Sequence, residues 1–286
     1  MKTAVSSYSF RKLMLNQGIS IFEVIEKAKE IGFDAIEFTN LEIPTENDDV
    51  FELAKNVKEK ADKVGIKISC YSVSADLLCG SDGDLEKEIE AVKRKVDIAN
   101  TLGVKLMRHD ATFNFPKAPL GFNDVLPHLA EGCKKITEYA KSFGIKTMVE
   151  NHGFFCQDSE RMEALVNAVG DENFGLQVDM GNFLCVDENP ILAVSRCAPY
   201  AYNAHVKDFI YKSGEGDALD GFINTRGGAY IRGTVAGHGI VPIKQCTRAL
   251  KKAGYDGFLT LEFEGWEETE HAIKAGFSTL SRLVNL

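Results

Sequence analysis

The segment KSFGIKTMVEN (residues 141–151) contains the pattern that decides the fold: the end of an amphipathic helix, a glycine, and an apolar strand. The pattern recurs as KEIGFDAIEFT (29–39), DKVGIKISCYS (62–72), NTLGVKLMRHD (100–110) and KKAGYDGFLTLEF (251–263). A glycine in the left-handed conformation commonly ends a helix just before a buried strand. We therefore expect positive φ angles at the five glycines of the pattern: Gly32, Gly65, Gly103, Gly144 and Gly254.

Three further strand-like segments complete a series of eight: TAVSSYS (3–9), NFGLQVD (173–179) and YNAHVKD (202–208). Strands that alternate with helices form parallel sheets with right-handed crossovers, and eight such units close into a barrel. The alternative is a doubly wound sheet, which would be expected to carry a Gly-rich phosphate turn after its first strand. Residues 6–18 (SSYSFRKLMLNQG) contain no such turn. The sequence thus predicts an α/β fold, a single (β/α)8 TIM barrel domain over residues 1–286.

Several element boundaries can also be predicted. Ser20 and Glu23 have the spacing of a capping box, Asp84 precedes an amphipathic helix, and Pro242 is expected in the first turn of another. The longest stretch without a clear periodic pattern runs from about Lys212 to Gly239, after the seventh strand. Long loops in compact domains are usually functional, and barrel enzymes place their active sites at this end of the strands.

Composition restricts the class of protein. The 286 residues have a net charge of -9, which argues against nonspecific nucleic-acid binding because that depends on basic side chains. No stretch approaches the length of a membrane span, and residues 1–13 do not resemble a signal peptide. The seven cysteines include no C-x-x-C pair, so we expect buried thiols and a cytoplasmic protein.

Four strand-like segments in the second half of the chain end on a residue that can ligate a metal: Glu150, Asp179, His205 and Glu262. They belong to strands five to eight, so all four should face the same mouth of the barrel. Three carboxylates and one imidazole suit Mn²⁺, Mg²⁺ or Co²⁺ better than the closed Cys/His set of structural zinc, although Zn²⁺ is also possible. One such residue alone would more often be a solvated acid or a core histidine. The four together predict a single divalent metal site.

The segments around these residues resemble a known superfamily. They are VENHG (149–153), VDMGN (178–182), HVKD (205–208), AGHGIVPI (236–243) and AGYDGFLTLEFEG (253–265). They are similar to the xylose isomerase-like, AP endonuclease family 2 superfamily, and within it to sugar (phosphate) isomerases and epimerases and to inosose dehydratase. The chain departs from the pattern at two substrate-contacting positions, with Asn182 where many members have His and Tyr211 where the epimerases have Arg.

The resemblance implies a metal-dependent enzyme that acts on a sugar or keto-sugar. Glu150, Asp179, His205 and Glu262 would hold the metal, and Glu150 and Glu262 would also be catalytic. One glutamate would remove the proton next to the carbonyl and the other would return a proton, through an enediolate that the metal stabilises. The other candidates for substrate contact are His109, His152, Asn182, Lys207, Arg232 and His238. A structural or solvated role is the alternative for His109, His152 and Arg232. For Lys207 the alternative is an ion pair with a ligand carboxylate.

Three other functions are open. A lyase such as an inosose dehydratase, or an enzyme of 3-keto-glycoside elimination, would use the same metal and base. DNA repair of the endonuclease IV type requires a three-zinc cluster with more histidines than this chain has at matching positions. A non-catalytic sugar-binding barrel would have no need of a metal site with two candidate bases. The expected partner is a small molecule rather than nucleic acid or a membrane, and the chain is expected to form a homo-oligomer, either a dimer or a tetramer.

Overall fold

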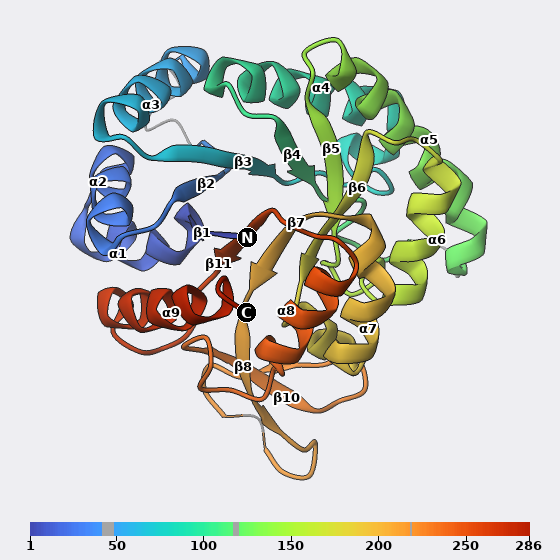
Figure 1. Ribbon diagram of the computed structural model, residues 1–286. Helices are drawn as coiled ribbons and strands as arrows, with labels where there is room; N and C mark the ends of the chain where they lie inside the picture. The colour runs from blue at the N-terminus through green and yellow to red at the C-terminus, as the bar shows by residue number, and fades with distance from the viewer. Residues whose placement is uncertain (42–48, 117–119, 218) are drawn as a thin grey trace.

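The computed structural model describes residues 1–41, 49–116, 120–217 and 219–286, and its central feature is a closed barrel of eight parallel strands (Figure 1). The strands follow one another around the barrel in the order β1, β11, β7, β6, β5, β4, β3, β2, and the barrel closes because β1 pairs with both β11 and β2. Their bounds are Lys2–Ser6 (β1), Ala35–Thr39 (β2), Lys67–Val73 (β3), Leu106–His109 (β4), Lys146–Glu150 (β5), Phe174–Asp179 (β6), Ala201–Val206 (β7) and Phe258–Leu261 (β11). The predicted (β/α)8 barrel is confirmed.

Helices surround the barrel and cover its outer face (Figure 1). The helices are α1 (Arg11–Gln17), α2 (Ile21–Ile31), α3 (Val50–Val64), α4 (Leu85–Leu102), α5 (Phe122–Lys141), α6 (Ser159–Val169), α7 (Pro190–Cys197), α8 (Ile243–Lys252) and α9 (Thr269–Leu283). Their buried apolar side chains join those of the strands in one connected core. Within the described ranges, no helix combines the length and the apolarity needed to cross a lipid bilayer.

Three of these helices end at the glycine that the sequence predicts. All five glycines of the repeated pattern have positive φ, between 65° and 112°, and Gly32, Gly65 and Gly103 are the left-handed caps of α2, α3 and α4. Ser20 and Glu23 make both hydrogen bonds of the capping box. The prediction for Pro242 was wrong by one position, because α8 begins at Ile243 and the proline is its N-cap. A proline is tolerated there because the cap position requires no intrahelical N–H.

A three-stranded antiparallel sheet extends from the end of β7, at the bottom of Figure 1. It consists of β8 (Asp208–Lys212), β9 (Ile223–Asn224) and β10 (Tyr230–Thr234), with β10 in the middle. The prediction of an irregular stretch from Lys212 to Gly239 was therefore wrong for β9 and β10, and residue 218 lies outside the described residues. β9 has two residues and β10 contains Gly233, so neither shows the alternation by which strands are identified in a sequence.

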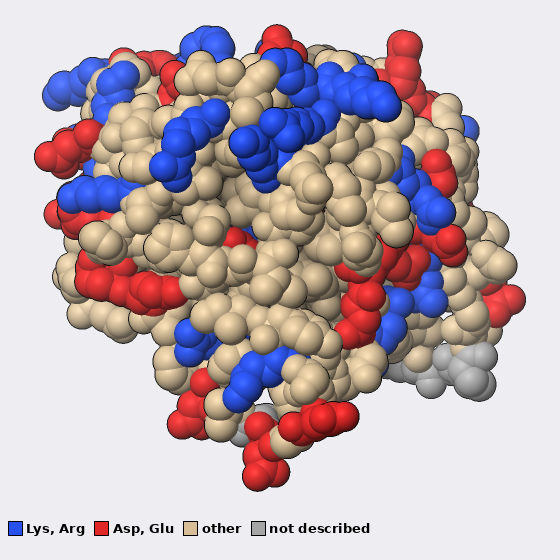
Figure 2. All heavy atoms as spheres, turned by 60° about the horizontal axis from the view of Figure 1, so that its bottom comes forward, with Lys and Arg blue, Asp and Glu red and all other residues tan. Residues whose placement is uncertain are grey.

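This extension has an aromatic base and an acidic tip. The guanidinium carbon of Arg232 lies 5.3 Å from the ring centre of Phe222 and 5.7 Å from that of Trp266, which follows β11. Figure 2 shows acidic side chains gathered at the far end, where the connection from β8 to β9 carries Glu215, Asp217 and Asp220. In the same view, basic side chains gather toward the opposite edge of the molecule. Cation–π contacts therefore link the extension to the barrel, and its tip is negative.

Candidate functional site

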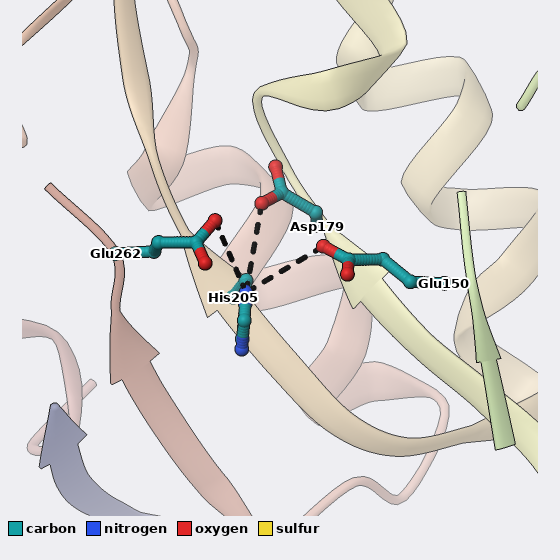
Figure 3. A group of neighbouring side chains, drawn as sticks. All are labelled: Glu150, Asp179, His205 and Glu262. Atoms are coloured by element: carbon teal, nitrogen blue, oxygen red, sulfur yellow. Dashed lines mark ion pairs between the residues drawn. The ribbon is translucent and has the colours of Figure 1, made fainter. Parts of the chain in front are cut away.

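The carboxyl ends of four strands bring the predicted metal ligands together. Glu150 and Asp179 end β5 and β6, His205 lies one residue before the end of β7, and Glu262 follows β11 directly. One possible ligand atom from each residue lies within 4.8 Å of the other three. Figure 3 shows the three carboxylates converging on the imidazole of His205. The arrangement has the donor types of a divalent metal site.

Glu37 on β2 sets the orientation of the His205 ring. The Nε2–H of His205 donates to the two carboxylate oxygens of Glu37, at 2.9 and 3.1 Å. Nδ1 then faces Glu150, Asp179 and Glu262, with a nitrogen-to-oxygen distance of 3.6, 3.7 and 3.6 Å respectively. A proton held on Nε2 leaves the Nδ1 lone pair free, which is how a carboxylate prepares a histidine to bind a metal.

Glu37 belongs to a hydrogen-bonded layer beneath the cluster, which we call the polar floor: Glu37, Ser72, Gln177 and Asn203. Ser72 Oγ donates to Glu37 at 2.9 Å, and Asn203 Nδ2 donates to Glu37 at 2.8 Å and to Gln177 at 2.9 Å. All four side chains are buried, and Glu37 and Gln177 are fully buried. Barrel interiors are usually filled by branched apolar side chains. Here polar bonds from several strands fix the carboxylate that orients His205.

The residues present fit a divalent cation. Asp179 Oδ1 accepts two backbone N–H bonds, from Gly181 at 2.7 Å and Asn182 at 2.8 Å, whereas its Oδ2 and His205 Nδ1 are buried without a hydrogen-bond partner. Unpartnered buried polar atoms are costly unless a ligand binds them. The cluster and its surroundings also contain six carboxylates and two permanent cations: Glu37, Asp110, Glu150, Asp179, Glu262 and Glu264, with Arg108 and Lys207. A hard cation would satisfy both orphaned atoms and reduce the excess negative charge.

The pKa values reflect this excess of negative charge. Burial raises the pKa of Asp179 to about 6, and the neighbouring Glu150 carboxylate adds to the effect despite the opposing charge of Lys207. Burial alone would lower the pKa of His205, but the charges of Glu37 and Glu262 outweigh it and hold that pKa well above its ordinary value. The cluster therefore favours bound positive charge, whether a proton or a metal ion.

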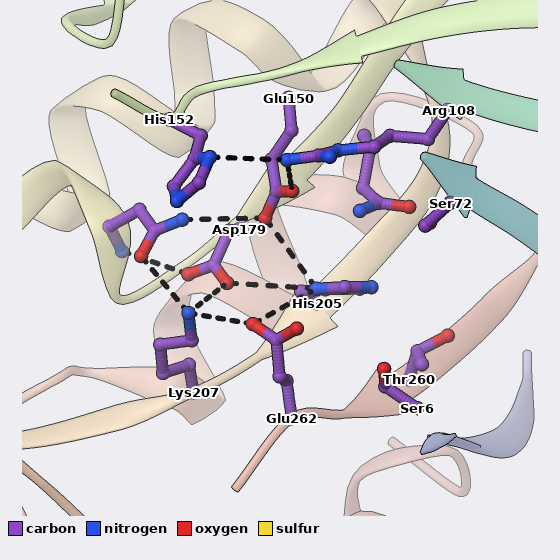
Figure 4. A network of polar contacts seen from close by, with 12 residues as sticks. Ser6, Ser72, Arg108, Glu150, His152, Asp179, His205, Lys207, Thr260 and Glu262 are labelled. Carbon is purple, nitrogen blue, oxygen red and sulfur yellow. Dashed lines mark hydrogen bonds and ion pairs between the residues drawn. The ribbon is translucent and has the colours of Figure 1, made fainter. Parts of the chain in front are cut away.

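Lys207, predicted as a substrate contact, adjoins the cluster (Figure 4). Asn182, also predicted as a substrate contact, is hydrogen-bonded to Lys207 and to Glu150. The Lys207 ammonium lies 2.6 Å from Glu262, 3.6 Å from Asp179 and 3.6 Å from Glu264. It also donates to Asn182 Oδ1 at 3.3 Å, while Asn182 Nδ2 donates to Glu150 at 3.3 Å. The Lys207 amine is thus buried among anions, and these anions raise its pKa well above the ordinary value even though burial opposes the shift.

His152, another predicted contact, belongs to a second network on the opposite side of Glu150 (Figure 4). Arg108 pairs with Glu150 at 2.5 Å and with Asp110 at 2.7 Å. His152 Nδ1–H donates to Asp110 Oδ1 at 2.9 Å, and the His152 side chain is 36% exposed. The Asp110 carboxylate therefore orients the His152 imidazole while the ring remains open to the cavity. His152, Lys207, Arg108 and Glu150 all line one cavity of about 300 Å³.

The structure places His109 away from this cavity. Successive residues of a strand point to opposite faces, and on β4 it is Arg108 that faces the site. His109 is fully buried, its ring centre lies 6.4 Å from that of Phe174, and its Nδ1–H donates to the Asp110 carbonyl at 2.9 Å. Burial lowers the pKa of His109 to about 4, so it is a neutral core histidine. The prediction that it contacts substrate is therefore corrected.

Arg232 and His238 do not line the cavity that Glu150, His205 and Glu262 share. Arg232 is held in the extension by Phe222 and Trp266, as described above. His238 lies in the turn before α8 and lines a different cavity, together with Pro242 and Thr279. Their place after strand seven suggested a contact, but Arg232 belongs to β10 of the extension and His238 to the turn that follows β10.

Four residues of the site did not emerge as candidates from the sequence: Glu37, Arg108, Asp110 and Glu264. Three of them had a local signal. Glu37 is an acidic residue inside the apolar segment AIEFT, which a buried strand accommodates only with partners. Arg108 and Asp110 flank the histidine in RHD, and strand alternation makes them the alternative to His109 for the inward-facing position.

A Glu37→Gln substitution is expected to weaken binding of Mn²⁺ or Zn²⁺ by about 10–100-fold, as changes to residues that orient a metal ligand commonly do. The new amide can donate to Nε2 as well as accept from it, so it no longer enforces one tautomer of His205. Calorimetric titration with the metal ion alone measures the affinity, and nitrogen NMR of the imidazole reports the tautomer.

Asp208→Asn is the matched control, because Asp208 is equally buried and accepts backbone bonds from Gly237 and Gly239 at 2.8 Å. This variant should lose stability and keep its metal affinity. Parental affinity together with an unchanged Nε2–H signal in Glu37→Gln would refute the orienting role of Glu37.

Comparisons with known proteins bear on the family and the fold. Residues 25–283 match the family model described as xylose isomerase-like TIM barrel. Inosose dehydratase from Lacticaseibacillus casei is 23% identical over 151 residues, which are 52% of this chain and 51% of that protein. The chain thus spans about half the length of the curated relatives it matches.

Solved structures share the whole barrel. The IOLI protein with a bound zinc atom superposes with a TM-score of 0.76 at 19% identity, covering 100% of this chain and 98% of that one. D-psicose 3-epimerase in the presence of D-fructose superposes with a TM-score of 0.72 at 15% identity and full coverage of both chains. At these identities the likeness establishes the fold alone. The match of the family model to most of the chain shows that this protein belongs to the xylose isomerase-like TIM barrel family.

Proposed function

We propose that this protein is a divalent-metal-dependent enzyme that removes a proton next to a carbonyl group of a sugar or keto-sugar, as an isomerase or epimerase. One observation carries the proposal: Glu150, Asp179, His205 and Glu262 converge within 4.8 Å, with an orphaned oxygen and an orphaned nitrogen directed into the cluster. The epimerase and the metal-containing structure among the similar barrels support it.

Two carboxylates of the site are placed to handle protons from different directions. Glu150 and Glu262 come from β5 and β11, and two strands lie between these in the barrel. Each carboxylate has its own cationic neighbour, Arg108 at 2.5 Å and Lys207 at 2.6 Å. A base on each side of the substrate carbon allows one residue to remove a proton and the other to return one. A bound divalent ion would supply a Lewis acid for the substrate carbonyl oxygen.

A dehydratase or other lyase is the second candidate, and the placement of Lys207 and His152 favours it. Elimination begins with the same proton removal, but it then needs an acid that protonates the departing oxygen. The Lys207 ammonium and the Asp110-oriented His152 both line the cavity and flank the two carboxylates. The match to inosose dehydratase supports this candidate as well.

One experiment separates these reactions. The Mn²⁺-loaded protein is incubated in D₂O with ketoses, inososes and 3-keto-glycosides, and the products are followed by proton NMR and ultraviolet absorbance. Deuterium at the carbon next to the carbonyl of recovered or epimerised sugar is the expected result for an isomerase or epimerase. A new absorbance from an unsaturated ketone is the expected result for a lyase.

Metal dependence provides the control for this experiment. Chelator-treated protein should show neither product, and readdition of Mn²⁺, Mg²⁺, Co²⁺ or Zn²⁺ should restore the reaction and identify the preferred ion. A protein that binds no divalent metal, and whose Glu150→Gln variant behaves like the parent, would refute the proposed function.

A further inference from the structure

A second and larger cavity adjoins the site. It has a volume of about 380 Å³, lies between α1, α2, α3 and the end of β2, and we call it the annex. Half of the described residues that line it have long apolar side chains: Met14, Leu15, Ile21, Leu41 and Leu53. Cavities of this size hold small-molecule ligands, and an apolar lining selects for apolar groups.

The annex and the site cavity share three lining residues, Tyr8, Thr39 and Asn40. The two cavities therefore meet at these side chains, and a ligand that occupied both would lie against them. The shared wall is fixed by hydrogen bonds. The Asn40 N–H donates to the Ser72 carbonyl at 2.9 Å, and Asn40 Oδ1 accepts from the Ser74 N–H at 3.3 Å.

The two cavities have opposite chemistry. The site cavity is bordered by carboxylates and suits a hydroxylated, polar group. Among the described residues that line the annex, Arg11 is the single charged side chain and no carboxylate is present. The Arg11 guanidinium carbon lies 6.0 Å from the ring centre of Tyr8, so a flat polar surface borders the aliphatic wall. Such a space accommodates a planar, apolar ring better than a second sugar, whose hydroxyl groups would remain without partners.

We propose that the substrate of this protein carries an aryl substituent on its sugar or keto-sugar part, and that the annex binds this substituent. The proposal refines the function proposed above by naming the substrate class, and it concerns the part of the substrate that does not react. Binding energy gained at a remote substituent then contributes to holding the reacting carbon at the two carboxylates.

Binding measurements test the annex without turnover. The full chain, with and without Mn²⁺, is titrated calorimetrically with 4-nitrophenyl β-D-glucopyranoside and with methyl β-D-glucopyranoside, neither of which has a carbonyl group. The aryl glucoside should bind about tenfold tighter or better, because burying part of one aromatic ring is enough for that difference. Equal affinities, or no binding of the aryl glucoside at millimolar concentration, would overturn the proposal.

Two variants locate the effect. Ile21→Asp and Leu15→Asp place a carboxylate in the annex, and both should reduce the aryl preference to less than about threefold. Ile21 is the first residue of α2, where an acidic side chain favours the helix, so the fold should be retained. Leu192→Asp is the control, since Leu192 lies in the first turn of α7 and is 69% exposed, like Leu15. An aryl preference that survives both annex variants would overturn the assignment to this cavity.

The outcomes separate this inference from the proposed reaction. Aryl preference in a protein that shows no deuterium exchange or elimination would overturn the reaction and support the annex. Exchange or elimination without aryl preference would support the reaction and overturn the annex. When both hold, an aryl 3-keto-glucoside should be turned over with a higher kcat/KM than 3-keto-glucose, and Ile21→Asp should remove that advantage.

Discussion

Replacement of Glu262 by Gln is expected to slow deuterium exchange or elimination by about 10²–10⁴-fold, the usual contribution of a positioned acid–base group. The Glu262 carboxylate lies 2.6 Å from the Lys207 ammonium and 3.6 Å from His205 Nδ1. An amide has the same shape but cannot accept the substrate proton. The rate is measured in D₂O at saturating Mn²⁺, with metal content determined on the same sample, so that loss of base is separated from loss of metal.

Glu264→Gln provides the matched control for this prediction. Glu264 lies two residues further along the chain, lines the same cavity and is also near Lys207, at 3.6 Å, but it does not belong to the four-residue cluster. Its amide variant should keep most of the activity. A metal-loaded Glu262→Gln protein that reacts at the parental rate would show that Glu262 is a ligand only, and Glu150 would then be the remaining candidate base.

Replacement of Lys207 by Met is expected to destabilise the metal-free protein by about 3–5 kcal/mol, because removing one partner of a buried ion pair leaves the other uncompensated. Lys207 is buried beside Glu262, Asp179 and Glu264, so the variant leaves three carboxylates without their shared cation. A saturating divalent ion should recover part of the loss, since a ligand that binds only the folded state stabilises it. Denaturant unfolding with and without Mn²⁺ measures both quantities.

The control here is Lys244→Met, which removes an exposed lysine of α8 and should change stability by no more than about 0.5 kcal/mol. The same Lys207 variant also separates the two candidate reactions. Elimination should fall more than deuterium exchange if the ammonium protonates the leaving oxygen, and both should fall equally if it only holds substrate. Parental stability of Lys207→Met without metal would contradict the buried ion-pair network.

The barrel could be predicted from the sequence because its evidence is local and repeated. Each helix end with its glycine, such as Gly32 or Gly103, marks a conformation that few other residues adopt, and an apolar strand follows directly. The extension could not be predicted in the same way. β9 has two residues, and β10 pairs with β9 and β8 rather than with the barrel, so their partners are set by tertiary contact rather than by periodicity.

The residues of the site also fall into those with a local signal in the sequence and those placed by tertiary contact. The four cluster residues could be proposed because each lies at the end of a strand, and the barrel brings strand ends together. Glu37 and Arg108 could not be proposed, because their place in the site depends on which side chains face inward and on contacts between residues far apart in the sequence. Glu37 contacts His205, which is 168 positions away, and Arg108 contacts Glu150. His109 shows the opposite error, since a histidine beside an inward-facing arginine on one strand faces outward.

The polar floor has a consequence for how the sequence of this barrel can change. Glu37, Ser72 and Asn203 come from three strands, and the buried Glu37 carboxylate accepts hydrogen bonds from both of the other side chains and from His205. A single substitution there removes a hydrogen-bond partner from its neighbours, so its effect on stability depends on which residues occupy the other positions. Double-mutant cycles within the floor should be strongly non-additive. Substitutions at the floor are therefore expected to be accepted in sets, whereas solvent-facing helix positions can vary one at a time.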